Sequence, residues 1–377
     1  MRGHVIWVVL VALVLAACTP DPVSRPTATS SPGTPAADSP APTASPAPDR
    51  SVASATALPP VAGPEVEVRD AATLKAALAA ARPGTTITLA DGTYLGDTVR
   101  DGNSDEPGRF HATTAGTAVA PITLRGSRRA VLDGGGPDGG YGLHLSNADH
   151  WQLDGFTVSS ASKGIVLDRS SQVSITDVRV TDIGAEGVHF RAFSSDNTLA
   201  RSEVDHTGLS KPNFGEGVYL GSAKSNWGTY SGGEPDASDR NQVLDNRITA
   251  TGAENIDIKE GSTGGTIRGN TFDGSAIAGK NSADSWIDVK GNDYLIQGNH
   301  GTRSLLDGFQ VHVPLEGWGR GNTFVDNVLD VQAPGVGIWL QNTAVDQGNV
   351  IRCSNRVTDA AAGDYATNHY TPLTCQP

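Results

Sequence analysis

The sequence predicts an all-β protein built as a single-stranded right-handed parallel β-helix, a solenoid with a short capping helix at its N-terminal end. The first observation is that "NIDIK" (255–259) is followed about thirty residues later by "WIDVK" (286–290). The second is that such words recur about 22 to 38 residues apart, as stacked coils require. Each has apolar residues at its second and fourth positions, the period of a strand with one buried face. The other six are "GLHLS" at 142, "GIVLD" at 164, "GVHFR" at 187, "GVYLG" at 217, "GFQVH" at 308 and "GIWLQ" at 337.

The first residues predict export. A short cationic start precedes an apolar run of about fourteen residues, which is too short for an ordinary membrane span and is typical of a secretion signal. The run ends in Leu15-Ala16-Ala17-Cys18, which resembles the bacterial lipobox, in which cleavage before the cysteine is followed by its lipidation. We therefore expect a lipoprotein signal peptide over 1–17 and a lipid on Cys18; the alternative is an ordinary cleaved signal.

Residues 18–64 are rich in Pro, Ser, Thr and Ala and predict a disordered tether. The β-helix domain is then expected over 65–377, held to the bacterial cell membrane through the lipid on Cys18. Charged residues cancel within 1–64, so the formal charge of −13 belongs to the domain and argues against nucleic-acid binding. We expect a monomer.

Asparagines and a helix complete the predicted solenoid. One asparagine recurs in the same relation to a second strand of each coil, which predicts a stacked ladder: Asn246, Asn270, Asn299, Asn327 and Asn355. The segment "DAATLKAALAAARPG" predicts a helix capped by Asp70 and stopped at Pro83-Gly84, which covers the open end of the solenoid. Cys353 and Cys375 are the cysteines left after Cys18 and predict a disulfide that pins the C-terminal tail.

The aligned words predict a charged strip on the outer face. Asp257 is expected beside Asp288, and Lys259 beside Lys290, about 4.8 Å apart across neighbouring strands. Glycines begin most of the words, and we expect them to let a chain-like ligand approach the backbone.

A resemblance extends this interpretation. "TLKAALAAARPGTTITLADGTY" and "APITLRGSRRAVLDG" resemble the opening of the pectin-lyase-like β-helix superfamily, and "ENIDIKEGSTGGTIRGNTF" is similar to the catalytic segment of its chondroitinase B and alginate lyase type. The resemblance implies that Glu254 is a Ca²⁺ ligand and that Lys259 is the Brønsted base. This chain differs where the family has a second acidic ligand, which is Gly252 here, and at Glu260, where the family has a serine.

β-Elimination of an acidic, uronate-containing polysaccharide fits these residues. The reaction needs a neutralised carboxylate and a base near its working pKa, and a neighbouring lysine would disfavour a second ammonium. Loop aromatics suit sugar stacking. The predicted catalytic residues are Lys259, Lys290, Arg191 and His312; the substrate-binding residues are Tyr219, Trp227, Trp286, Gln310 and Trp339; and the Ca²⁺ ligands are Glu254, Asp257 and Asp288.

Three alternatives stay open. The Asp and Lys columns could be a salt-bridged ladder without a catalytic role. Asp257 and Asp288 could instead be the acid and base of a glycoside hydrolase. A tethered solenoid could also bind or scaffold glycans without cutting them. His144 and His189 are interpreted as polar surface residues.

Overall fold

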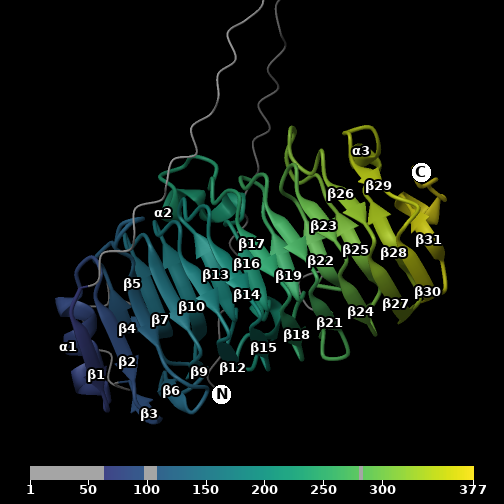
Figure 1. Ribbon diagram of the computed structural model, residues 1–377. Coiled ribbons are helices and arrows are strands. Elements are labelled where there is room, and N and C mark those ends of the chain that lie inside the picture. Colours follow the sequence, from purple (N-terminus) through teal and green to yellow (C-terminus); the bar gives the residue numbers. More distant parts are fainter. Residues whose placement is uncertain (1–62, 97–107, 280–282) are drawn as a thin grey trace, which may run out of the picture. The chain divides into compact units, whose positions relative to one another are not determined.

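The computed structural model describes residues 63–96, 108–279 and 283–377. The predicted signal peptide, Cys18 and almost all of the predicted tether therefore lie outside the described residues. The described strands form three sheets in which every paired strand is parallel, and their order follows the chain in steps of one coil. Figure 1 shows these strands running from the first helix at one end to the last strand and the C terminus at the other. The predicted parallel β-helix is confirmed.

One sheet carries the pentapeptides and is called the front sheet here. It consists of β4 (Gly108–Ala112), β7 (Tyr141–Ser146), β10 (Lys163–Asp168), β13 (Val188–Arg191), β16 (Val218–Leu220), β19 (Ile256–Ile258), β22 (Ser285–Val289), β25 (Asp307–Val311), β28 (Val336–Leu340) and β31 (Gly363–Ala366).

The other two sheets close each coil. The second sheet consists of β1 (Glu65–Val68), β2 (Thr86–Leu89), β5 (Ile122–Arg125), β8 (Trp151–Asp154), β11 (Ser174–Thr176), β14 (Thr198–Ala200), β17 (Gln242–Leu244), β20 (Thr266–Arg268), β23 (Leu295–Gln297), β26 (Thr323–Val325) and β29 (Val350–Ile351). The third consists of β3 (Gly92–Leu95), β6 (Ala130–Asp133), β9 (Thr157–Ala161), β12 (Arg179–Ile183), β15 (Glu203–Asp205), β18 (Arg247–Thr249), β21 (Thr271–Asp273), β24 (His300–Thr302), β27 (Val328–Ala333) and β30 (Arg356–Ala360).

The register of the front sheet is the predicted one. Ile256 is paired with Val218 on one side and with Ile287 on the other, and the series continues in both directions. The second and fourth positions of each word face the interior, and all but Leu340 are fully buried. The apolar alternation therefore stacks like residues inside the solenoid, which leaves the third and fifth positions on the outer face.

The glycines that begin the pentapeptides serve coil packing and not ligand approach. A Cβ on Gly187 would lie 2.5 Å from Cγ1 of Val204 and 2.6 Å from the carbonyl oxygen of Gly217. A Cβ on Gly217 would likewise meet Ile248 at 2.4 Å. The expectation that these glycines admit a ligand is therefore wrong, because the missing side chains would collide with the protein's own coils.

The predicted asparagine ladder is present and fully hydrogen-bonded. Asn299 donates from its backbone N and from Nδ2 to Oδ1 of Asn327, at 3.0 Å each, and its own Oδ1 accepts the equivalent pair from Asn270. Its Nδ2 also donates to the carbonyl oxygen of Ile267. These side chains are buried, so the ladder satisfies backbone groups that would otherwise lack partners between the coils.

Replacing Asn299 by alanine should lower the free energy of unfolding by about 3 kcal/mol, because several buried donors and acceptors lose their partner at once. Equilibrium urea unfolding measures this loss. Asn226→Ala is the matched control, since Asn226 is exposed and its side chain makes no capping hydrogen bond to α2 (Trp227–Tyr230); its expected effect is within about 0.5 kcal/mol. Equal losses in the two variants would contradict a structural role for the ladder.

The ends of the solenoid are closed as predicted. Helix α1 (Ala71–Ala80) begins at Asp70, which forms a capping box with Thr73, and buries Leu74, Ala77 and Leu78. Cys353 and Cys375 form a disulfide that ties the C-terminal tail to the last coil. The remaining helices are short: α2 (Trp227–Tyr230), α3 (Asn342–Val345) and the 3₁₀ turns η1 (Pro212–Phe214), η2 (Lys224–Asn226) and η4 (Asn368–Tyr370). None of the helices in the described ranges is long and apolar enough to cross a bilayer.

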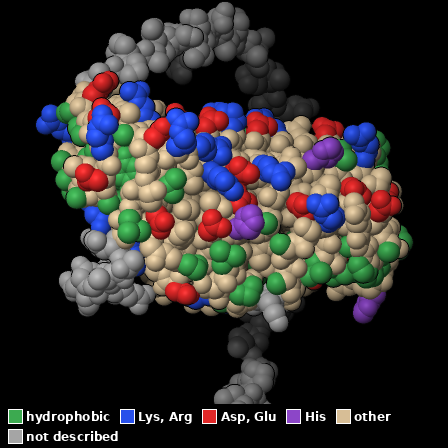
Figure 2. All heavy atoms as spheres, turned by 90° about the horizontal axis from the view of Figure 1, so that it is seen from below, with side chains coloured by type: hydrophobic (Ala, Val, Ile, Leu, Met, Phe, Trp, Pro, Cys, Tyr) green, Lys and Arg blue, Asp and Glu red, His purple; other side chains and the backbone are tan. Residues whose placement is uncertain are grey.

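Several charges outside the front sheet are paired across coils. Arg179 contacts Asp205 at 3.1 Å, and Arg201 contacts Asp177 at 2.9 Å. On the face seen in Figure 2, basic and acidic side chains are interspersed over the described residues. Interspersed charges of both signs are typical of a solvated surface. Nucleic-acid binding would require a continuous basic strip to contact the phosphate backbone.

Candidate active site

The repeated Asp-x-Lys words form one charged cluster on the outer face of the front sheet. Asp257 on β19 is paired in register with Asp288 on β22, and Lys259 and Lys290 follow these strands. Lys259 Nζ lies 2.5 Å from Oδ2 of Asp257. Lys290 Nζ lies 3.1 Å from the other oxygen of Asp257 and also contacts Asp288. The predicted alignment is confirmed, and Asp257 bridges both lysines.

The carboxylates around the two lysines favour the ammonium form of both. Burial alone would lower the pKa of Lys259, but attraction to Asp257 and Asp288 outweighs it and raises the pKa above the usual range. The pKa of Lys290 is raised for the same balance of reasons. The expectation that one lysine is neutral because of its neighbour is therefore wrong, since the two carboxylates outweigh lysine–lysine repulsion.

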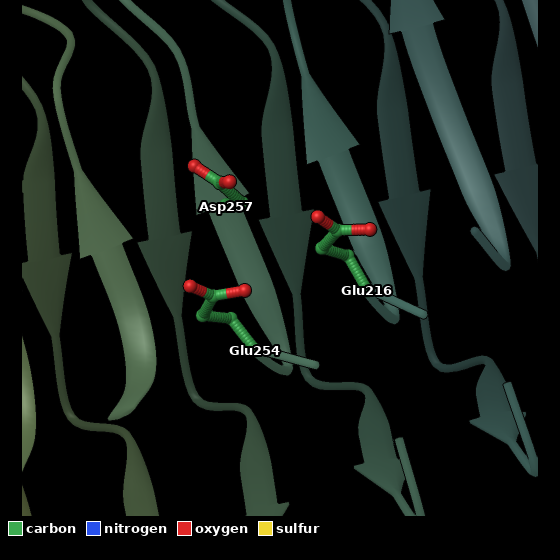
Figure 3. Close-up of side chains that lie close together, drawn as sticks. All are labelled: Glu216, Glu254 and Asp257. Atoms are coloured by element: carbon green, nitrogen blue, oxygen red, sulfur yellow. The ribbon is translucent and has the colours of Figure 1, made fainter. Parts of the chain in front are cut away.

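A group of three buried carboxylates adjoins the lysines: Glu216, Glu254 and Asp257. One oxygen of each lies within 4.8 Å of the others. Figure 3 shows Glu254 and Asp257 on one coil and Glu216 on the neighbouring coil, with the side chains on the same side of the sheet. Glu216 Oε2 is buried without a hydrogen-bond partner. Burial and nearby carboxylates raise the pKa of Glu216 to about 8 and raise the pKa of Glu254 well above its usual range.

The charges of this region favour a divalent cation. Glu216, Glu254, Asp257 and Asp288 carry four potential negative charges, whereas Lys259 and Lys290 supply two positive ones. Burial and the neighbouring carboxylates raise the pKa values of both glutamates, which favours their protonated forms when no cation is bound. An oxygen-rich, acid-rich site of this kind is what Ca²⁺ prefers. The donor set therefore fits the predicted cation, although the third carboxylate that lies with Glu254 and Asp257 is Glu216 and not Asp288.

His312 extends the cluster by one strand. Its Nε2 lies 2.9 Å from Oε1 of Gln310 and 3.6 Å from Asp288. The amide nitrogen of Gln310 donates to Asp284 and Asp307, which orients Oε1 toward the imidazole. Because an amide oxygen can only accept, His312 Nε2 is the donor in this contact.

Tyr219 lies on the other side of the lysines. Its ring centroid is 4.9 Å from Lys259 Nζ, and its backbone is paired with Asp257. Burial and the surrounding carboxylates raise the pKa of its hydroxyl well above the usual value. Tyr219 therefore remains a neutral phenol, able to donate a proton next to Lys259.

The chain is similar to an alginate lyase from Paenibacillus sp. str. FPU-7. The two are 38% identical, with a TM-score of 0.70, and the match covers 81% of this chain and 98% of that one. This chain belongs to the right-handed β-helix family of polysaccharide lyases. Residues 136–293 also match the family described as "Right handed beta helix region".

Two more distant structures share the fold of this lyase-family chain. Pectate lyase Pel9A is 18% identical with a TM-score of 0.55, and the match covers 81% of this chain and 79% of that one. PfbA, a surface adhesin of Streptococcus pneumoniae, is 11% identical with a TM-score of 0.52, and the match covers 79% and 74% of the two chains. No curated protein sequence matches this chain. At these identities the similarity shows the fold alone, so function has to be argued from the site.

Glu216 was not predicted. The chain has a glycine, Gly252, where the resembled family has its second acidic ligand. The structure groups Glu216 with Glu254 and Asp257. Gly252 packs against Gly208, where a Cβ would lie 3.2 Å from the Gly208 Cα, so a larger residue has little room there. The third carboxylate comes instead from the preceding coil, just before β16. A signal was available: Glu186, Glu216 and Glu254 each immediately precede a pentapeptide on three successive coils.

Arg191 belongs to a separate buried cluster of the front sheet. It forms two hydrogen bonds with Asp168, and its guanidinium lies 4.0 Å from the Tyr230 ring centroid. Arg191 is on β13, two strands from β19, which is about 10 Å from the column position of Lys259. The structure therefore does not bring Arg191 to the lysines as predicted.

Two of the predicted substrate-binding aromatics are turned inward. Trp286 is fully buried in the core, where its Nε1 donates to the carbonyl oxygen of Thr302 and Gly301 makes room for the ring. Trp227 is 8% exposed and donates to the carbonyl oxygen of Ser222 within its own loop. Substrate stacking on Trp286 is excluded by its burial. Trp339 is half-buried and contacts the His312 ring at 5.0 Å, so it remains available at the site.

His144 and His189 are buried, and the interpretation of them as surface residues is wrong. His144 Nε2 contacts Asp168 at 2.9 Å. His189 Nε2 lies 2.9 Å from the carbonyl oxygen of Gly221, and its ring packs on Tyr219 with centroids 4.5 Å apart. Burial, together with repulsion from Arg191 and Lys163, lowers the pKa of His189 to about 3 despite attraction to Glu186.

His189 should make the stability of the protein fall as pH decreases. The unfolded chain binds a proton near pH 6.5 and the folded chain only near pH 3, so stability is lost as pH falls through this window. The loss should be about 2 kcal/mol between pH 7 and pH 5. Urea unfolding at the two pH values measures it. His189→Gln, which keeps a donor for Gly221, should lose this component; an unchanged pH dependence in that variant would contradict the assignment.

Proposed function

We propose that the protein is a polysaccharide lyase that cleaves a uronate-containing acidic polysaccharide by β-elimination, with Lys259 as the base. One observation carries this proposal. Two lysines lie on the outer face together with three grouped carboxylates of the kind that bind cations, in a chain 38% identical to an alginate lyase. A simple salt-bridged ladder would need Asp257 and Asp288 only. It would not account for Glu216 and Glu254, which lie buried beside it.

The elimination assigns a role to each group. Lys259 Nζ takes the proton from the carbon next to the uronate carboxylate, a carbon–carbon double bond forms, and the bond to the glycosidic oxygen breaks. A proton donor then protonates that leaving oxygen. Lys290 lies on the adjacent coil, where its ammonium can neutralise the substrate carboxylate and make the carbon acid stronger. Lys259 must lose its own proton first, which its contact with Asp257 opposes.

Glu216, Glu254 and Asp257 would hold Ca²⁺. When bound, the ion would supply positive charge that neutralises the substrate carboxylate alongside Lys290. Asp257 has a second role without the ion, since its ion pair with Nζ positions Lys259.

Two side chains could donate the proton to the leaving oxygen, and Tyr219 is the better placed. Its hydroxyl makes no hydrogen bond in the described part of the chain and its ring lies against Lys259 Nζ, whereas Nε2 of His312 is already committed to Gln310. We therefore expect Tyr219→Phe to lower kcat by about 100-fold or more, and His312→Asn by less than tenfold. Steady-state absorbance assays measure both; a larger loss in His312→Asn would reverse the assignment.

One assay tests the proposed function. The purified protein is incubated with alginate, pectate and glycosaminoglycans, with and without Ca²⁺. New ultraviolet absorbance from unsaturated ends is the expected result. New reducing ends without that absorbance would mean hydrolysis, and retarded migration with neither would mean glycan binding only; either outcome would overturn the lyase proposal.

We also propose that the protein is exported and anchored to the bacterial cell membrane by a lipid on Cys18, which lies outside the described residues. The lipobox-like Leu15-Ala16-Ala17-Cys18 supports this location. Detergent phase partitioning tests it: the wild-type protein should enter the detergent phase and Cys18→Ser should not. Equal partitioning of the two would refute anchoring.

A further inference from the structure

A pocket lies at one end of the charged cluster. Its volume is about 550 Å³, and its walls are the loop after β25 and the segment that includes α3. The two walls are joined, because Oε1 of Gln341 accepts a hydrogen bond of 2.8 Å from the backbone N of Val313. The pocket is therefore a built feature of two adjacent coils.

The pocket continues the line of the catalytic side chains. Lys290, His312 and Gln341 directly follow β22, β25 and β28 in turn. The backbone N–H of each donates to a carbonyl oxygen of the preceding front-sheet strand, so the parallel hydrogen-bond ladder continues through these positions. Gln341 is two strands beyond Lys290, about 10 Å along the solenoid. A glycan that lies along the strip with its cleavage point at the lysines would extend into this pocket.

The lining of the pocket differs in charge from the cluster beside it. It offers neutral hydrogen-bonding groups on Gln341 and Thr343 and an apolar surface on Val313 and Leu315. Its charged members are Glu316 and Asp346, and the described lining contains no Lys, Arg or His side chain. A uronate in the pocket would meet two like charges and no counter-charge, whereas a neutral sugar would find hydroxyl partners and an apolar wall.

We propose that this pocket is a subsite for a neutral sugar, and that the preferred substrate is an acidic heteropolysaccharide in which uronates are interspersed with neutral sugars. The inference rests on the proposed function, because it takes the lysines as the cleavage point. Glu316 and Asp346 then act as a selectivity filter that rejects a carboxylate at this position.

Charge removal tests the filter. Glu316→Gln/Asp346→Asn should raise kcat/KM about fivefold for homopolyuronate oligomers long enough to reach the pocket, and should leave it unchanged for the shortest cleaved oligomers and for oligomers with a neutral sugar at that position. The matched control is Asp245→Asn/Asp326→Asn, which removes two exposed charges from turns between the other two sheets. It should change none of these values.

Calorimetric titration of the same oligomers in a Lys259→Ala background gives a second readout that needs no turnover. In this background, Glu316→Gln/Asp346→Asn should bind the long homopolyuronate about fivefold more tightly. That result supports the filter even if no unsaturated product forms. Equal affinities or equal kcat/KM in the filter and control variants overturn the pocket assignment and leave the lyase proposal intact. Absence of unsaturated products in every protein overturns only the lyase proposal, and absence of all binding overturns both.

Discussion

Replacing Lys259 by alanine should reduce the rate of formation of unsaturated ends by about a thousandfold or more, while the protein stays folded. A positioned base contributes roughly 10² to 10⁴ in rate, and Lys259 also supports the geometry of Asp257. The front-sheet register comes from the interior residues Ile256 and Ile258, which the substitution leaves unchanged. Absorbance assays measure the rate, and circular dichroism with thermal unfolding verifies the fold.

Lys259→Arg is the informative companion. It keeps the positive charge beside Asp257, but a guanidinium does not lose its proton in proteins. If Lys259 is the base, the arginine variant should be as inactive as the alanine variant. If Lys259 only neutralises charge, the arginine variant should retain substantial activity, and that result would remove Lys259 from the proton transfer.

The activity of the wild-type protein should rise with pH across the neutral and mildly alkaline range. Attraction to Asp257 and Asp288 raises the pKa of Lys259, so the unprotonated fraction grows with each increase in pH. This dependence is the expected signature of the same base and disappears in Lys259→Ala. A flat profile would point to another proton acceptor.

The sequence was sufficient to predict the register of the front sheet. A strand period of two forces every second residue inward, and Ile-x-Ile in one word and Ile-x-Val in the next can share the interior only if Asp257 lies beside Asp288. The asparagine ladder and the helix cap at Asp70 follow from equally local chemistry. Periodic features of a solenoid are predictable because each coil repeats the same physical constraint.

The non-periodic features were not predictable in the same way. Trp286 occupies the position where most words have glycine, and its ring enters the core because Gly301 on the next coil leaves space for it. Glu216 reaches the carboxylate group from the turn before β16, where strand alternation no longer determines direction. The protonation of Lys259 depends on the balance between burial, which lowers its pKa, and attraction to two nearby carboxylates, which raises it. Composition alone does not determine that balance.

Adding Ca²⁺ should stabilise the protein, and Glu216→Gln should abolish that effect. At about 100 times its dissociation constant, a ligand bound only by the folded state contributes about 2.7 kcal/mol to the free energy of unfolding. The pKa of Glu216 is raised to about 8, so this side chain is mostly protonated at neutral pH without a cation. Glutamine has the shape of that neutral form but cannot supply an anionic oxygen to a cation. We therefore expect Glu216→Gln to match the wild type in chelator and to lose the gain in Ca²⁺.

Differential scanning calorimetry with chelator, Ca²⁺ or Mg²⁺ measures the shift in Tm. Mg²⁺ should give a smaller shift, because it demands a tighter octahedral arrangement than three carboxylates on two coils can easily adopt. Glu203→Gln is the control, since Glu203 lies on β15 in the third sheet and should leave the Ca²⁺ response intact. A Ca²⁺ shift retained in Glu216→Gln would place the ion elsewhere. Loss of stability of that variant in chelator would instead show that Glu216 is ionised in the folded protein.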